Sequence, residues 1–127
     1  MTTENQSILL IDDDANYLTA TRDLLETQGY TVETYNQAFG ATALIQKMRP
    51  NLVLLDINMP GLSGENLARL LRLNDNTRHI PIVFHSSNDE DSLRIAVSRY
   101  RVTGYICKGN LFELRQKVAY YLRRSNN

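Results

Sequence analysis

Carboxylates, a serine and a lysine stand within two residues of the ends of short apolar runs in this 127-residue chain. Asp12 and Asp13 follow the first run, Asp56 the third, Ser86 the fourth and Lys108 the fifth. Two like charges about 4 Å apart repel by roughly 4 kcal/mol at an effective dielectric constant near 20. If the three carboxylates meet in one pocket, that pocket therefore requires a cation or raised carboxyl pKa values.

Mg²⁺ suits such a pocket, because it is a hard ion that prefers oxygen ligands. We predict Asp13 and Asp56 as direct ligands and Asp12 as a ligand through water, and the backbone oxygen of Asn58 could complete the set. A carboxylate that binds metal through one oxygen can attack phosphorus with the other. The residue types therefore predict phosphoryl transfer to Asp56.

Lys108 and Ser86 are predicted to act on the same phosphoryl group, through a charge-assisted contact and a hydroxyl hydrogen bond respectively. Taken singly, each is more often an ordinary surface lysine or turn serine. Their places after apolar runs favour the functional interpretation. Asp14 is better explained as the N-cap of the helix that follows.

Five apolar runs predict the strands that would position these residues: Ile8–Ile11, Thr31–Tyr35, Leu52–Leu55, Ile80–Phe84 and Gly104–Ile106. The first, third and fourth are continuously apolar, as in central strands covered on both faces, and the second alternates like a strand nearer an edge. Between them lie five segments with helical spacing, and Asn110 with Glu113 has the spacing of a capping box for the last one.

Alternating strands and helices predict a doubly wound α/β fold with a parallel sheet. In such sheets functional groups collect beyond the carboxyl ends of the strands, where the strand order reverses. The length fits a single domain over residues 1–127, with polar tails at about 1–6 and 124–127. All the candidate residues lie at the expected edge of that sheet.

The overall composition limits the partners. Fourteen acidic and fourteen basic residues cancel, so no general basic field favours nucleic acid or a membrane surface. The polar start, the lack of a long apolar run and the single Cys107 favour a cytoplasmic protein.

Four segments together resemble the response-regulator receivers of two-component signalling, of the chemotaxis-regulator kind. They are Ile8–Asp14 (ILLIDDD), Leu52–Gly64 (LVLLDINMPGLSG), Pro81–Ser86 and Gly104–Lys108 (GYICK). The resemblance implies a flavodoxin-like fold with five helices around five parallel strands in the order 2-1-3-4-5. It also implies a switch that catalyses only its own phosphorylation and dephosphorylation.

By this resemblance Asp56 is the phosphoacceptor, Asp12 and Asp13 hold Mg²⁺, Lys108 contacts the phosphate, and Ser86 and Tyr105 form the switch. A histidine kinase or histidine phosphotransfer protein would donate the phosphoryl group. Signalling would pass through the face formed by the fourth helix, fifth strand and fifth helix, either to a downstream protein or to a second copy of the chain.

Two residues stand out from the pattern. The family usually has proline after the lysine, often with a cis bond, and here Gly109 follows Lys108. A cis bond without proline costs about 2.5 to 4 kcal/mol, so we predict a trans linkage or a reshaped loop. His85 ends an apolar run and is predicted to be buried with a hydrogen-bond partner.

Two other functions remain open. The chain could be a receiver-like interaction domain that is not switched by phosphorylation, which Gly109 would favour. It could also be an aspartate-dependent phosphatase, but these usually carry a second aspartate two residues after the nucleophile, and Asn58 occupies that place.

Overall fold

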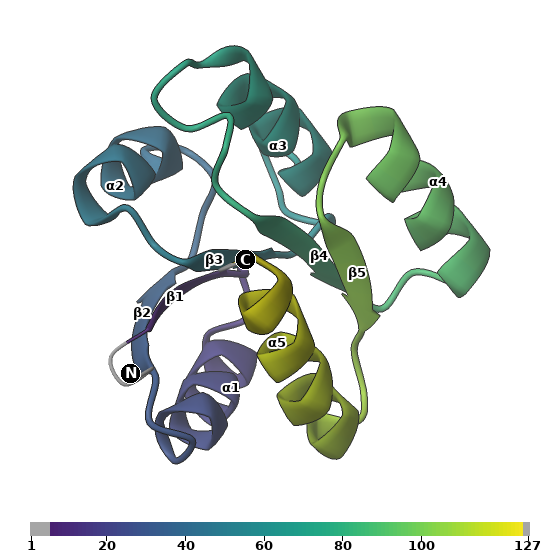
Figure 1. Cartoon of the computed structure of the whole chain (residues 1–127). Helices are drawn as coiled ribbons and strands as arrows, with labels where there is room; N and C mark the ends of the chain where they lie inside the picture. The colour runs from purple at the N-terminus through teal and green to yellow at the C-terminus, as the bar shows by residue number, and fades with distance from the viewer. Residues whose placement is uncertain (1–5, 126–127) are drawn as a thin grey trace.

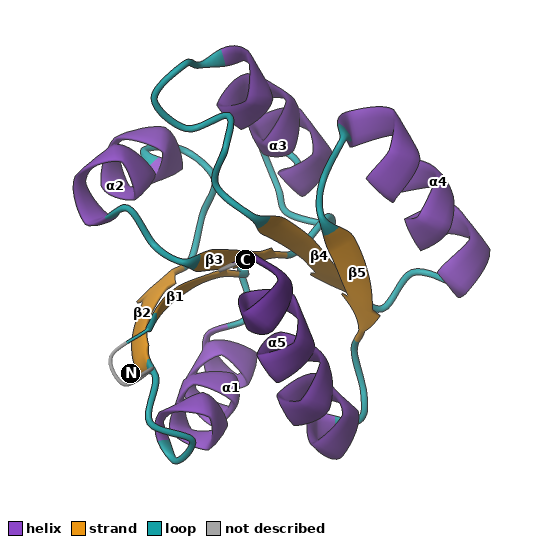
Figure 2. Cartoon of the chain, in the orientation of Figure 1, coloured by secondary structure: helices purple, strands orange, loops and turns teal. Residues whose placement is uncertain are grey.

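The computed structural model describes residues 6–125 as a five-stranded parallel sheet between two layers of helices (Figure 1). The strand order is β2-β1-β3-β4-β5, as predicted. Helices α2, α3 and α4 cover one face of the sheet, and α1 and α5 cover the other (Figure 2).

The elements in chain order are β1 (Ser7–Ile11), α1 (Ala15–Glu26), β2 (Thr31–Tyr35), α2 (Ala41–Met48), β3 (Leu52–Leu55), α3 (Gly64–Leu73), β4 (Ile82–Ser86), α4 (Glu90–Tyr100), β5 (Gly104–Cys107) and α5 (Leu111–Ser125). Of the predicted polar tails, residues 1–5 and 126–127 lie outside the described part. Arg124 belongs to helix α5 instead of a tail.

The burial of the strands follows their places in the sheet. In β3 every residue is buried, because Leu52 and Leu54 face the α1/α5 layer while Val53 and Leu55 face the α2/α3/α4 layer. In the edge strand β2 only Val32 is fully buried. The predicted contrast between central runs and an alternating edge run is confirmed.

The fourth strand lies two residues later than its apolar run predicts. The prediction was Ile80–Phe84, whereas β4 spans Ile82–Ser86. Ile80 is buried, but its N–H donates to a turn carbonyl before the ladder begins. His85 and Ser86 continue the strand because their polar side chains find hydrogen-bond partners inside the protein.

Two helix starts agree with the capping predictions. The Asp14 carboxylate accepts the N–H of Tyr17 at 3.1 Å and caps α1. The Asn110 side chain accepts the N–H of Glu113 at 3.0 Å at the start of α5. Both caps lie just beyond the carboxyl ends of strands, so they help to define the loops around the site.

The helical spacing of Leu67, Leu70 and Leu71, and of Leu111, Leu114 and Val118, predicts that these side chains face inward, but two of the leucines are exposed. Leu70 of α3 and Leu111 of α5 keep 42% and 43% of their surface accessible. Hydrophobic periodicity shows which face of a helix turns inward, but not how far the surface it packs against extends.

The register of the strands brings the candidate residues together. Ile11 of β1 pairs with Leu55 of β3, so Asp12 and Asp56 leave the sheet side by side. Strands β1 and β3 are also where the order of the sheet reverses, since β2 lies beyond β1.

Within residues 6–125, no helix combines the length and the apolar character needed to cross a bilayer.

Gly64, the first residue of α3, lies against the end of β3. A methyl group on Gly64 would overlap the backbone carbonyl of Asp56, so Gly64→Ala must push α3 away from the end of β3. We expect a loss of about 1–3 kcal/mol in the free energy of unfolding, measured by urea denaturation. Gln116→Ala, on the exposed side of α5, is the control and should change stability by less than about 0.5 kcal/mol. Equal stability of the two variants would contradict the close packing.

Candidate functional site

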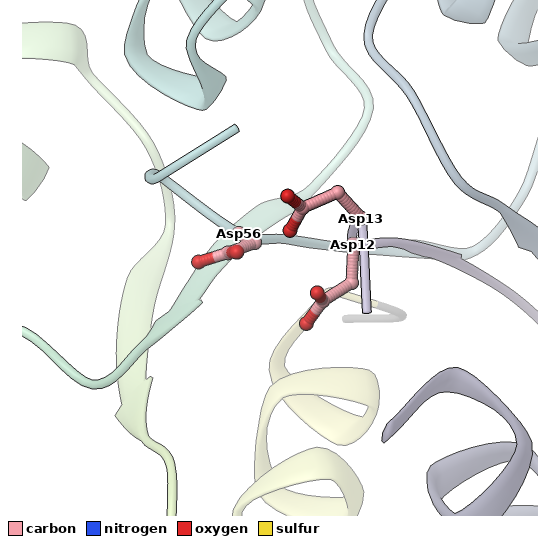
Figure 3. Close-up of side chains that lie close together, drawn as sticks. All are labelled: Asp12, Asp13 and Asp56. Atoms are coloured by element: carbon pink, nitrogen blue, oxygen red, sulfur yellow. The ribbon is translucent and has the colours of Figure 1, made fainter. Parts of the chain in front are cut away.

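Three carboxylates converge beyond the ends of β1 and β3, as the register requires. Asp12, Asp13 and Asp56 each present an oxygen, and these oxygens all lie within 4.8 Å of one another (Figure 3). Asp12 and Asp56 are only 4% and 5% exposed, while Asp13 is open to solvent. The predicted acidic cluster is therefore present, with two buried members and one exposed member.

Lys108 supplies the positive charge from the end of β5. Its Nζ lies 2.6 Å from Oδ2 of Asp12 and 3.6 Å from Oδ2 of Asp56. The other oxygen of Asp12 accepts the N–H of Asp14 at 2.9 Å. Both Asp12 oxygens are thus engaged by the protein, whereas those of Asp56 are held more loosely.

The electrostatics follow from this arrangement. Burial raises the pKa of Asp56, Lys108 opposes the rise, and the charges of Asp12 and Asp13 add to it. For Lys108, burial favours the neutral form, but the hydrogen bond to Asp12 and the charge of Asp56 outweigh it, so its pKa is raised. The pocket combines a carboxylate that is costly to ionise with a firmly protonated lysine.

Ser86 lies on the other side of Asp56, within a small polar network. Its Oγ accepts the N–H of Asn88 at 3.2 Å and lies 3.4 Å from the side-chain nitrogen of Asn58. The same nitrogen donates to Oδ1 of Asn88 at 2.8 Å. The Asn58 side chain thus connects the loops that follow β3 and β4.

Tyr105, on β5, points away from this network. Its hydroxyl donates to Oε2 of Glu90, in the first turn of α4, at 2.5 Å. The ring is partly buried, and Nζ of Lys117 from α5 lies 5.7 Å from its centroid. Tyr105 therefore contacts all three elements of the predicted output face.

Comparisons with known proteins identify the family of the chain and agree with its fold. The family profile described as response regulator receiver domain matches residues 8–119. The chain belongs to the response regulator receiver family. It is 34% identical over 94 residues to the polar-differentiation response regulator DivK of Brucella anthropi, covering 70% of this chain and 76% of DivK.

Two solved receivers are also similar. A CheY-like response regulator receiver domain protein from Methanospirillum hungatei superposes with a TM-score of 0.85 at 25% identity, covering 97% of this chain and 98% of that one. The BeF3-activated N-terminal receiver domain of RstA from Klebsiella pneumoniae gives 0.82 at 29% identity, covering 92% and 98%. The receiver resemblance and the flavodoxin-like fold predicted from the sequence are confirmed.

This receiver has an aromatic support beneath its lysine that the sequence did not predict. The Tyr17 ring centroid lies 4.6 Å from Nζ of Lys108, and the Tyr17 hydroxyl lies 2.6 Å from Nε2 of His85. Nδ1 of His85 lies 3.0 Å from the carbonyl oxygen of Ile106, which can only accept, so Nδ1 carries the proton. Nε2 of the neutral ring then accepts from Tyr17.

His85 is buried and hydrogen-bonded, as the sequence predicted, and it has two partners. Tyr17 gave no recognisable signal in the sequence. Tyr17 lies three residues after the N-cap Asp14, in helix α1. The sequence does not show which strand residues this helix packs against. Only the packing of α1 against the end of β4 brings the two rings to 5.4 Å between centroids.

The loop after the lysine differs from the usual receiver pattern, as predicted. No peptide bond is cis within residues 6–125, so the linkage to Gly109 is trans. Gly109 has φ +118°, a conformation open to glycine but not to proline, whose ring holds φ near −65°. Lys108 reaches Asp12 and Asp56 although glycine, with this backbone conformation, follows it.

The buried His85 makes the stability of this receiver depend on pH. Burial lowers the pKa of His85 below its ordinary value of 6.5, and the nearby Lys108 charge lowers it further, against the hydrogen bond to Ile106. Between the lowered pKa and the ordinary one, the unfolded chain binds more protons than the folded chain. The contribution of His85 to the free energy of unfolding is therefore fully present above the ordinary pKa, and it declines as the pH falls through that interval.

His85→Gln, which does not titrate, should show a smaller loss of unfolding free energy than the wild type between about pH 7.5 and pH 5.5. Urea denaturation at both pH values measures the difference. His79→Gln removes the other histidine, which is exposed, and serves as the matched control that should behave as the wild type does. Identical pH dependence in wild type and His85→Gln would contradict the assignment.

Proposed function

We propose that this chain is the phosphoacceptor receiver of a two-component phosphorelay, with Asp56 as the acceptor. The observation that carries the proposal is the pocket itself: a buried Asp56 with Asp12 and Asp13 on one side and the Lys108 ammonium 3.6 Å away. A single receiver domain over residues 1–127, working in the cytoplasm, completes this proposal.

The donor set fits Mg²⁺. Asp13 and Asp56 have the least engaged oxygens and would be direct ligands, together with the backbone oxygen of Asn58, while the fully engaged Asp12 would act through water. When bound, the ion would neutralise charge on the phosphoryl oxygens.

The residues of the site would then have separate roles in phosphoryl transfer. An oxygen of Asp56 forms a bond to phosphorus as the bond from phosphorus to the donor histidine breaks, and the donor nitrogen leaves with the electron pair. Lys108 and the Ser86 hydroxyl would donate to the phosphoryl oxygens. Hydrolysis of the aspartyl phosphate by water would restore the carboxylate, so the chemistry is confined to the receiver itself.

The switch would use Ser86 and Tyr105. In the present arrangement the Ser86 hydroxyl is held by Asn58 and Asn88, and Tyr105 is held outward by Glu90. A phosphoryl group on Asp56 would compete for the serine, and its movement would leave space for the tyrosine to turn inward. The face of α4, β5 and α5 would then change shape for a downstream protein or for a second copy of the chain.

The acceptor can be tested with acetyl phosphate and Mg²⁺, which should add one phosphoryl mass to the wild type in intact mass spectrometry. Asp56→Asn should abolish the addition. Removing Mg²⁺ with a chelator should slow it at least about tenfold, because the carboxylates and the phosphoryl oxygens then repel one another. Asp14→Asn is the matched control, since it neutralises a carboxylate of the same acidic run that only caps α1. An unmodified, folded wild type would overturn the proposal.

The loop at Gly109 favours a second candidate, a receiver-like interaction domain that is not switched by phosphorylation. Backbone amide NMR spectra with and without Mg²⁺ and beryllium fluoride separate the two. The switch predicts shifts that reach Tyr105 and α5, whereas the alternative predicts shifts confined to the residues around Asp56.

A further inference from the structure

A groove between α3 and α4 is lined by four arginines and no acidic residue. The lining residues are Arg69, Arg72, Leu73, Arg99, Tyr100 and Arg101, and the groove measures about 570 Å³. Since α4 starts beside the site and ends at Tyr100, the groove lies at the far end of that helix from Asp56. The chain as a whole has no net charge, so this is a local concentration of positive charge.

Arg72 gives the groove a fixed frame. Its Nε donates to the carbonyl of Arg101 at 2.8 Å, and its Nη1 donates to the carbonyls of Arg78 and Ile80 at 3.0 and 2.8 Å. One guanidinium thereby ties the end of α3 to the turn after α4 and to the loop before β4. The walls of the groove are held in place before any ligand arrives.

The other three arginines are available for a ligand. Arg69, Arg99 and Arg101 are exposed, and no carboxylate in residues 6–125 pairs with any of them. Arg69 makes only a long contact of 3.4 Å with Asn66. By contrast, Arg94 on the same helix α4 is paired with Glu90 and Asp91.

Apolar surface lies among these charges. Leu73 is 72% exposed at the edge of the groove, next to the partly buried Tyr100. A small inorganic anion would leave this surface uncovered. An extended chain that carries carboxylates and an apolar side chain matches both features, and arginine and tyrosine are enriched at energetically important positions of protein interfaces.

We propose that this groove binds an acidic segment of a partner protein, with carboxylates on Arg69, Arg99 and Arg101 and an apolar side chain on Leu73. The site is separate from the acceptor pocket and does not depend on phosphorylation of Asp56. Because the groove is positively charged, charge complementarity requires a negatively charged partner segment. The hydrogen bonds of Arg72 fix the shape of the groove.

The test uses a short fluorescein-labelled peptide in which pairs of glutamates alternate with leucine, titrated with the receiver in a fluorescence anisotropy assay. Wild type should bind the peptide, more weakly at high salt. The double variant Arg69→Gln/Arg99→Gln should raise Kd about tenfold or more, and Leu73→Ser should also raise it. A peptide with lysine in place of glutamate should not bind.

Arg115→Gln/Arg123→Gln is the matched control, because it removes two exposed arginines from α5 on the opposite face of the sheet (Figure 1). It should bind as the wild type does. Circular dichroism should show that all variants are folded, and Arg72 is left intact because it holds three carbonyls.

Two results would overturn the proposal. One is no binding of the glutamate–leucine peptide, and in that case binding of short-chain polyphosphate that depends on Arg69 and Arg99 would assign the groove to phosphate ligands. The other is equal weakening by the two double variants, which would mean attraction by general charge.

Discussion

Repulsion among like charges at the carboxyl end of the sheet is the constraint that the other residues of the site must offset. A parallel sheet directs the carboxyl ends of its strands to one edge, and here that edge carries three aspartates within 4.8 Å. Burial makes the ionised form of Asp56 costlier and raises its pKa. The folded chain therefore needs positive charge at this edge, and Lys108 provides it from the neighbouring part of the sheet.

The lysine in turn needs a support, and this receiver builds one from aromatic side chains. Tyr17 lies beneath the ammonium, and His85 accepts the Tyr17 hydroxyl while its other nitrogen is bound to the backbone of β5. Such a chain of contacts links the start of α1 to strands β4 and β5. It contacts Lys108 through Tyr17, and Lys108 is directed at Asp12 and Asp56 although glycine at φ +118° follows it.

Helix α4 carries oppositely charged features at its two ends. Its first turn has Glu90 and Asp91, and Glu90 holds Tyr105 of the predicted output face. Its last turn and the residue after it contribute Arg99 and Arg101 to the basic groove. This arrangement follows the helix dipole, which favours acidic residues at the start and basic residues at the end. The helix dipole does not explain why Arg99 and Arg101 have no carboxylate partner within residues 6–125.

The sequence by itself determined the fold class and the members of the acidic cluster, because apolar runs and strand-end residues are local patterns that a parallel sheet translates directly into positions. The strand order followed from the resemblance of four segments to receivers, since local patterns do not show which strands are neighbours. The sequence misplaced β4 by two residues, since only the tertiary structure shows that His85 and Ser86 find partners inside the protein. Tyr17 was missed for the same reason. Contacts between residues 68 positions apart, such as Tyr17 and His85, depend on how a helix packs across the sheet, and no local pattern encodes that packing.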